Sequence, residues 1–227
     1  MNELVVISTF VLLCLAVGTA TRWGLKQLYV ISVFIILASN VTVGIQVDVF
    51  GVSISLGVII YSIIYLVTDI VSEFHERHEA YKLAATNVVI QLAFWIYIFI
   101  SILATPSGGQ DAYSAMVSLF ASTARITIAA LVASLGAFID ICFYEWMLKK
   151  SINENEKYAP KLWLRNIVST FLGQSVNTAI FFTIALYGVV PNLTSIILSA
   201  IAIKWAIAVV DTPFLYWARL IHQRANI

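Results

Sequence analysis

Apolar residues form long runs along this chain, and the polar segments between them are short. A helix that crosses a bilayer core of about 30 Å needs roughly 20 apolar residues and satisfies its own backbone polar groups. Seven runs meet this requirement and predict transmembrane helices at Leu4–Ala20, Leu28–Ile45, Ile54–Val71, Leu83–Leu103, Ile126–Leu148, Asn166–Val190 and Ser195–Trp217. The sequence therefore predicts an all-α integral membrane protein, a polytopic helical bundle.

Composition agrees with this pattern. Hydrophobic residues make up 61% of the 227 residues and charged residues 11%, whereas soluble domains average about 45–50% and about 25%. We expect a single transmembrane domain over 1–227, because the longest polar segment, Lys149–Lys161, is too short for a soluble domain. The first apolar run has no basic residue before it, so we expect a retained helix and not a cleaved signal peptide.

Lysine and arginine predict the orientation of the helices. Short loops rich in these residues stay in the cytoplasm, and of the thirteen, all but Arg125 and Lys204 follow the first, third, fifth and seventh runs. We therefore expect a multi-pass protein of the cytoplasmic (inner) membrane, with the amino terminus outside and the carboxyl terminus in the cytoplasm. If the first run lay in the interface, six crossings would remain and only the amino-terminal end would change sides.

Charged residues also occur within or beside the predicted spans. Lys204 lies near the middle of the last run, where an ammonium costs about 2.5–3.5 kcal/mol, so it must face a water-filled cavity or an acid. Asp211, two turns along the same helix, is about 10 Å away and too far for a direct ion pair. A structural ion pair with Asp140 or Asp69 and a functional role both stay open. Arg125, on the predicted outer side, either reaches the headgroups or contacts a ligand.

The sixth run carries the densest uncharged polar face. Its polar side chains recur at helical spacing and form one stripe: Thr170, Gln174, Asn177 and Thr178. Amides in hydrocarbon either hydrogen-bond between helices or line a site, since Asn and Gln can bond the edge of a purine. Asn40 stands alone on an otherwise apolar run and permits the same two interpretations.

The segment YLVTDIVSEFHERH at 65–78 ends the third run. Asp69 and Glu73 lie one turn apart and share a face that can point into the bundle. The residues 75–79 form the solvated start of a loop in our interpretation, and HERHE is not the zinc motif H-E-x-x-H. Walker and G-x-S-x-G motifs are missing as well. We therefore expect no metal, no cofactor and no catalytic residue.

Four blocks occur in order along the chain: YLVTDIVSE, ARITIAALVASLGAFIDICFYE, LWLRNIVSTFLGQSVNTAIFFTIALYG and IKWAIAVVDTPFLY. Together they resemble the queuosine precursor transporter family, also called the vitamin uptake transporter family, from about Ser39 to Tyr216. The resemblance implies a six-helix core, here 28–219, that imports 7-deazaguanine bases such as preQ0, preQ1 or queuine. The helix and loop at 1–27 would then be an addition to that core, which makes about seven crossings.

The resemblance also implies binding residues. With the polar positions above, the predicted substrate-binding residues are Asn40, Asp69, Glu73, Arg125, Asp140, Gln174, Asn177 and Lys204. A guanine-like ring needs an acid or amide at its amidine edge, for which Asp69 or Asp140 would serve, and an apolar face, for which Trp95 or Trp205 would serve. Glu73 would contact the ligand, act as a gate or pair with Arg165.

Two positions depart from the family pattern. Asn177 stands where the family usually has Asp, and an amide cannot carry a proton. The segment E-R-H-E-A at 76–80 replaces a glycine and basic character, so this loop would differ in gating or in a partner contact.

The main hypothesis is thus a membrane importer of queuosine precursors and not an enzyme. The alternative is the substrate-binding membrane subunit of a multi-component importer energised by a separate ATPase. A membrane-embedded enzyme would need a nucleophile or metal constellation that the sequence lacks. Expected partners are a deazapurine base and the lipid bilayer, with a homo-oligomer allowed. Nucleic acid is not expected, because thirteen basic and twelve acidic residues nearly cancel.

Overall fold

The protein is a polytopic helical membrane protein, as predicted. The computed structural model describes residues 1–43, 45–49, 51–120, 123–153, 161–188 and 192–225. Seven helices within these ranges are long and apolar enough to span a membrane. The elements are α1 (Asn2–Trp23), α2 (Leu25–Thr42), β1 (Gln46–Val49), β2 (Val52–Ser55), α3 (Leu56–Phe74), α4 (Arg77–Ile102), α5 (Gln110–Phe120), α6 (Thr123–Ala133), α7 (Leu135–Asn153), α8 (Leu162–Leu186) and α9 (Leu193–Ala225).

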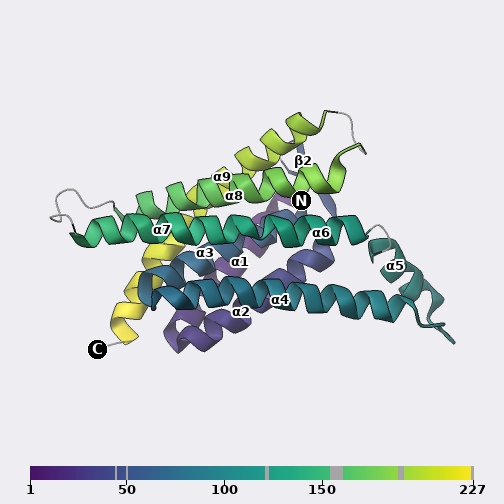
Figure 1. Cartoon of the computed structure of the whole chain (residues 1–227), viewed down its shortest axis with the longest axis horizontal. Helices are drawn as coiled ribbons and strands as arrows, with labels where there is room; N and C mark the ends of the chain where they lie inside the picture. The colour runs from purple at the N-terminus through teal and green to yellow at the C-terminus, as the bar shows by residue number, and fades with distance from the viewer. Residues whose placement is uncertain (44, 50, 121–122, 154–160, 189–191, 226–227) are drawn as a thin grey trace.

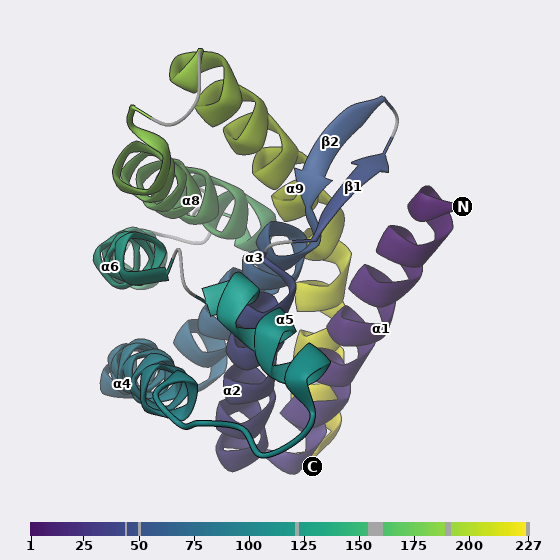
Figure 2. The same cartoon turned by 90° about the vertical axis from the view of Figure 1, so that its right-hand side faces the viewer.

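Helix α3 forms the centre of the bundle. It contacts α1, α2, α4, α7, α8 and α9, and Figure 2 shows it surrounded by the other helices. In the most apolar 18-residue stretch of α3, 78% of the residues are buried inside the protein. Because other helices surround α3, its polar side chains, such as Thr68 and Asp69, lie in the interior of the molecule.

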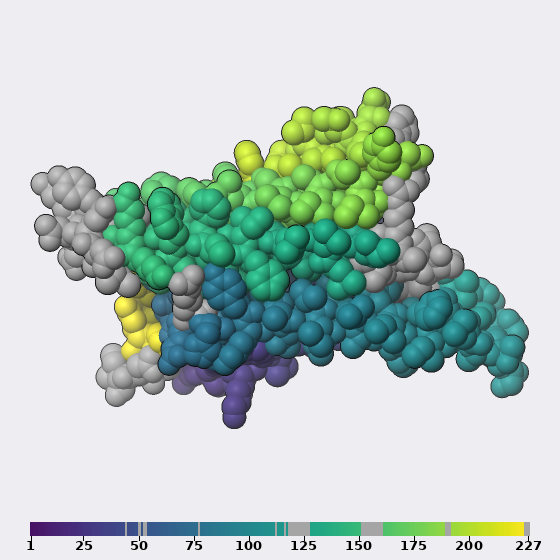
Figure 3. Space-filling model, viewed as in Figure 1, coloured from purple at the N-terminus to yellow at the C-terminus, as the bar shows by residue number. Residues whose placement is uncertain are grey.

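The outer helices present apolar side chains to their surroundings. Figure 3 shows one face, which α4, α7 and α8 cover. Large exposed hydrophobic residues on these helices include Val89, Leu92, Ile96, Phe99, Ile100, Phe143, Trp146 and Leu172. An exposed apolar belt of this kind suits contact with lipid, because hydrocarbon tails replace water there.

The predicted span Ile126–Leu148 is present but is interrupted at one residue. Helices α6 and α7 follow each other nearly in line (Figure 1), with Ser134 between them. The Ser134 Oγ donates to the carbonyl of Ala130 at 3.0 Å. Hydroxyl groups that bond back to the preceding turn in this way often bend helices. The two helices still make one span, from Ile128 to Lys150.

Two segments between the predicted spans hold regular structure. Strands β1 and β2 pair antiparallel, with Val47 opposite Ile54, and Gly51 in their turn has a φ of 78°, which glycine adopts without strain. Helix α5 lies in the next loop on the same side. The Asn2 Nδ2 donates to the Asp48 carbonyl at 3.2 Å, so the amino terminus lies at the hairpin end. Figure 1 places the carboxyl terminus at the other end.

The residues 75–79 do not form the predicted loop. Helix α3 ends at Phe74 and α4 begins at Arg77, so only two residues link them. The ring of Phe74 stacks on His222 of α9, with centroids 4.8 Å apart, and the ring of His75 meets His222 edge-on. These ring contacts hold the short link against the end of α9.

Glycines allow α7 and α8 to approach closely. A Cβ atom on Gly136 of α7 would touch the backbone carbonyl of Gly173 and lie 2.6 Å from the Asn177 Cβ. A Cβ atom on Gly173 would lie 2.6 Å from the Asp140 Cβ. Small residues at helix crossings let backbones meet in membranes, and this crossing places Asp140 and Asn177 in the interior.

The variant Gly136→Ala tests this crossing. We expect it to lower stability by about 1–3 kcal/mol, because the added methyl meets backbone that cannot rotate away. Thermal unfolding of the purified protein in detergent measures the change. Gly108→Ala is the matched control, since nothing lies within 4 Å of a Cβ there. Equal unfolding midpoints for both variants would contradict the tight crossing.

Candidate functional site

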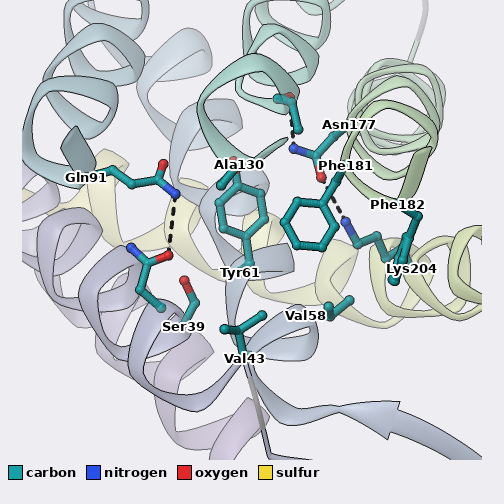
Figure 4. Close-up of a pocket in the computed structure, with 13 residues that line it drawn as sticks. Ser39, Val43, Val58, Tyr61, Gln91, Ala130, Asn177, Phe181, Phe182 and Lys204 are labelled. Atoms are coloured by element: carbon teal, nitrogen blue, oxygen red, sulfur yellow. Dashed lines mark hydrogen bonds between the residues drawn. The ribbon is translucent and has the colours of Figure 1, made fainter. Parts of the chain in front are cut away.

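A small cavity lies in the bundle between α2, α3, α4, α6, α8 and α9 (Figure 4). Its volume is about 50 Å³, which suffices for a few water molecules. The polar side chains that line it are Ser39, Asn40, Tyr61, Gln91, Asn177 and Lys204. Three of the predicted binding residues, Asn40, Asn177 and Lys204, thus come together from three helices.

Asn40 and Gln91 form an amide pair across α2 and α4. The Gln91 Nε2 donates to the Asn40 Oδ1 at 3.4 Å. The other amide atoms, Asn40 Nδ2 and Gln91 Oε1, are buried and have no hydrogen-bond partner among the described residues. Buried polar atoms are normally paired, so such atoms indicate a place for water or a ligand. The pair leaves one donor and one acceptor available.

Lys204 lies on the opposite side of the cavity. Its Nζ donates to the Asn177 Oδ1 at 2.9 Å and lies 5.7 Å from the centre of the Tyr61 ring. Among the described residues Lys204 forms no salt bridge, so the interpretation as a structural ion pair does not hold here. A buried ammonium without a carboxylate is expensive unless polar groups or water solvate it, and the cavity can supply that solvation.

Aromatic rings form the walls of the cavity. The rings of Tyr61 and Phe181 lie between Gln91 on one side and Lys204 on the other (Figure 4), and Phe182 adds a third ring. Neither predicted tryptophan lines it.

Trp205 stacks on Phe171, with centroids 4.6 Å apart, and its Nε1 donates to Ser175 Oγ at 3.1 Å. Trp95 packs with Ile98 and Phe94 in a separate small cluster. The structure therefore places both predicted aromatic faces away from this cavity.

Two other predicted residues, Asp69 and Asp140, lie outside the cavity. They are neighbours in space, because Thr68, which precedes Asp69 in α3, bonds Asp140 of α7. Thr170 Oγ1 donates to Asp69 Oδ2 at 3.1 Å, and Thr68 Oγ1 donates to Asp140 Oδ2 at 3.3 Å. Since Asp69 follows Tyr61 by two turns of α3, the carboxyl pair lies about 12 Å further along that helix.

Glu73 forms a buried ion pair beyond the carboxyl groups. Its Oε2 accepts from Arg165 Nη2 at 2.6 Å and from the Tyr144 hydroxyl at 2.9 Å. Both charged side chains are over nine-tenths buried. Of the three roles expected for Glu73, the structure shows the partner of Arg165. The pair joins α3 to α8 near the end opposite the hairpin.

Two predicted residues stay outside these groups. Gln174 is fully buried, both its amide atoms lack a hydrogen-bond partner among the described residues, and it does not line the cavity. The side chain of Arg125 lies outside the part that the structure describes, so its predicted role stays a prediction.

The sequence prediction missed Tyr61 and Gln91. Each of them lies four residues from another polar residue on the same helix face, and this spacing is visible in the sequence. Tyr61 and Asp69 fall on one face of α3, with Tyr65 between them at spacings of four. Gln91 follows Asn87 by four residues on α4, and Asn87 bonds Ser32 of α2 at 2.7 Å. Polar residues spaced by four on these runs would have revealed both faces.

A larger cavity of about 490 Å³ lies at the hairpin end. The hairpin, α3, α8 and α9 enclose it, and Val58 and Phe182 line both this cavity and the smaller one. These two side chains therefore separate a roomy outer space from the polar cavity in the bundle.

Comparisons with known proteins identify the family. The model of a family described as "Putative vitamin uptake transporter" matches residues 55–218. The chain belongs to this family. It is also 26% identical over 200 residues to a Bacillus subtilis (strain 168) protein named "Probable queuosine precursor transporter". The matched region covers 87% of this chain and 85% of that protein. No solved structure gives a significant match.

The match to the vitamin uptake transporter family confirms the resemblance inferred from the sequence. The matched span begins at Ser55 and covers α3 to most of α9, so Asn40 precedes it. The predicted division into 1–27 and a core of 28–219 is not tested by this span and stays a prediction.

The ion pair of Glu73 and Arg165 generates a stability prediction. We expect Glu73→Gln to destabilise the protein by about 3–5 kcal/mol, because it leaves a buried guanidinium without its carboxylate. The double variant with Arg165→Gln should lose less than the two single variants together. Lys82→Gln serves as the control, since Lys82 pairs with Glu79 in an exposed position and should cost less than about 1 kcal/mol. Additive losses measured by thermal unfolding would show that the pair contributes no coupling.

Proposed function

We propose that this chain imports queuosine precursors, 7-deazaguanine bases such as preQ0, preQ1 or queuine, across the cytoplasmic membrane. The family and the name of the relative support transport. The main support for a deazaguanine base as substrate is the buried amide pair of Asn40 and Gln91, which has one unpaired donor and one unpaired acceptor beside aromatic rings.

The chemistry of the cavity suits a guanine-like base. Such a base presents a carbonyl oxygen next to ring N–H and amino donors, and its faces are flat and apolar. In this proposal the Asn40 Nδ2 donates to the carbonyl and the Gln91 Oε1 accepts from an N–H group, as amides do with bases elsewhere. Tyr61 and Phe181 cover the faces of the ring. Lys204 donates to a further acceptor of the base.

The two cavities suggest the route of the base. The inner cavity of about 50 Å³ is smaller than the 300 Å³ or more that ligand sites usually offer. In this proposal Val58 and Phe182 move aside, so that a base passes from the 490 Å³ cavity to the amide pair. The ion pair of Glu73 and Arg165 closes the other end. Alternating access then requires the ion pair to open while Val58 and Phe182 close the passage to the 490 Å³ cavity.

The orientation follows from the distribution of Lys and Arg. We propose that the hairpin and the amino terminus face the outside and that the carboxyl terminus lies in the cytoplasm. Import then begins at the 490 Å³ cavity.

Uptake of labelled preQ0 and preQ1 in cells that lack both synthesis and their own transporter tests the function. We expect Asn40→Ala and Gln91→Ala to lower uptake at least tenfold, since each removes a buried hydrogen bond worth about 1–3 kcal/mol. Asn87→Ala is the matched control, because it removes a buried amide between the same helices, one turn from Gln91. Wild-type uptake by both cavity variants at equal expression would contradict the substrate site.

Transport by the purified chain in liposomes distinguishes a self-sufficient transporter from a subunit that needs a separate ATPase. We expect the chain alone to carry labelled base across the membrane without ATP, and we expect the base to be recovered unchanged. Uptake that requires added ATPase subunits would instead identify the chain as the binding subunit of a multi-component importer. Chemical conversion of the base would show an enzyme.

A further inference from the structure

Three carboxyl groups lie deep in the bundle. Asp69, Asp140 and Asp211 are each 1% exposed or less. Within the described residues, none of them forms a salt bridge with a Lys, Arg or His side chain. An ionised carboxylate in apolar surroundings costs several kcal/mol unless a cation compensates it. At least part of this cluster must therefore hold protons or another cation.

Asp69 and Asp140 are the two that lie beside each other, because the hydroxyl of Thr68, the residue next to Asp69, donates to Asp140. Two ionised carboxylates side by side in an apolar interior repel each other, whereas a proton held by the pair removes one of the two charges. Thr170 and Thr68 donate to the Oδ2 atoms, and neither Oδ1 atom receives a hydrogen bond from another described residue. The two Oδ1 atoms are thus available to a proton.

The nearby positive charges are engaged elsewhere. Arg165 binds Glu73, and Lys204 binds Asn177. Besides Thr68 and Thr170, the side chains whose charges or hydroxyls act on the pair are Tyr65 of α3, Tyr144 of α7, Ser169 of α8 and Asp211 of α9, with Cys14 of α1 beside Asp211. From α2 and α4, no described charged group contributes. Nothing described around the pair neutralises it.

A buried hydroxyl connects the pair with the cavity. The Tyr65 hydroxyl is buried and has no hydrogen-bond partner among the described residues. The Tyr65 ring and the Asp140 Cβ both lie within 3.0 Å of the point where a Cβ on Gly173 would sit. On the other side the Tyr65 ring meets the ring of Tyr61, with centroids 6.3 Å apart. Tyr61, Tyr65 and Asp69 therefore form a row along α3 from the cavity to the acids.

We propose that Asp69 and Asp140 form the proton-binding site that couples this transporter to the proton gradient. The proposal rests on the proposed function. With one shared proton the pair carries one negative charge, and a second proton makes it neutral. The second proton enters while the inner cavity communicates with the hairpin end. It leaves to the opposite side when the ion pair of Glu73 and Arg165 opens, which restores the single shared proton.

The proton site is tested first without substrate. Infrared spectroscopy of the purified protein at neutral pH should show a protonated carboxyl band that Asp69→Asn and Asp140→Asn each remove or shift. Asp48→Asn, at an exposed position of the hairpin, should leave the band unchanged. A spectrum that is the same in wild type and both buried variants would overturn the proposal whether or not the chain transports a base.

Transport then tests the coupling. In liposomes with acid outside, wild-type protein should accumulate labelled preQ1 at least tenfold above equilibrium and should acidify the lumen faster when the base is added. A protonophore, which collapses the pH gradient, should abolish the accumulation. Asp69→Asn and Asp140→Asn should lose this accumulation yet still exchange labelled for unlabelled base at equal pH. Asp48→Asn should behave as wild type.

The outcomes separate the two proposals. Accumulation driven by a sodium gradient at equal pH, or proton-driven accumulation by both Asn variants, would overturn the proton site and leave import intact. If wild-type protein exchanges no deazaguanine base, the proposed function fails, while the infrared result still decides whether the pair holds a proton.

Discussion

Helix α8 places charged and polar groups in the interior of an apolar bundle, and the neighbouring helices are arranged to meet them. Arg165 binds Glu73 of α3, Thr170 binds Asp69 of α3, and Asn177 binds Lys204 of α9. An unpaired polar group in hydrocarbon costs several kcal/mol. Because these contacts recur along α8, they hold α3 and α9 at defined positions against it. The glycine crossing with α7 brings Asp140 into the same interior.

The ionic, acidic and amide groups follow one another along the length of the bundle. The buried ion pair lies nearest the end opposite the hairpin, the carboxyl pair comes next, and the amide and ammonium cavity follows. The 490 Å³ cavity opens beyond Val58 and Phe182. A transporter needs a binding region between two barriers that open in turn. In the proposed mechanism the ion pair and the side chains of Val58 and Phe182 act as these barriers.

The seven spans could be predicted because apolar length alone determines a membrane helix. The break at Ser134 could not, since it depends on one hydroxyl bond within an apolar run. Asn40, Asn177 and Lys204 were found as polar residues in apolar runs, and the structure brings them to one cavity. Asp69 and Asp140 were also found, but the sequence does not show that they lie beside each other. The partner of Asn40 was missed, because the pairing with Gln91 depends on how α2 packs on α4. Whether Trp95 and Trp205 line this cavity also depends on helix packing, and the structure shows that they do not.

In our proposal, the cavity between Asn40, Gln91, Tyr61 and Lys204 binds a 7-deazaguanine base. Determination of the structure with preQ0 or preQ1 bound tests this most directly. We expect density for a flat bicyclic ring against Tyr61, with its polar edge toward the amides of Asn40 and Gln91 and with Phe182 displaced. Density confined to the 490 Å³ cavity or to the lipid-facing surface, with the amide pair unchanged, would contradict it.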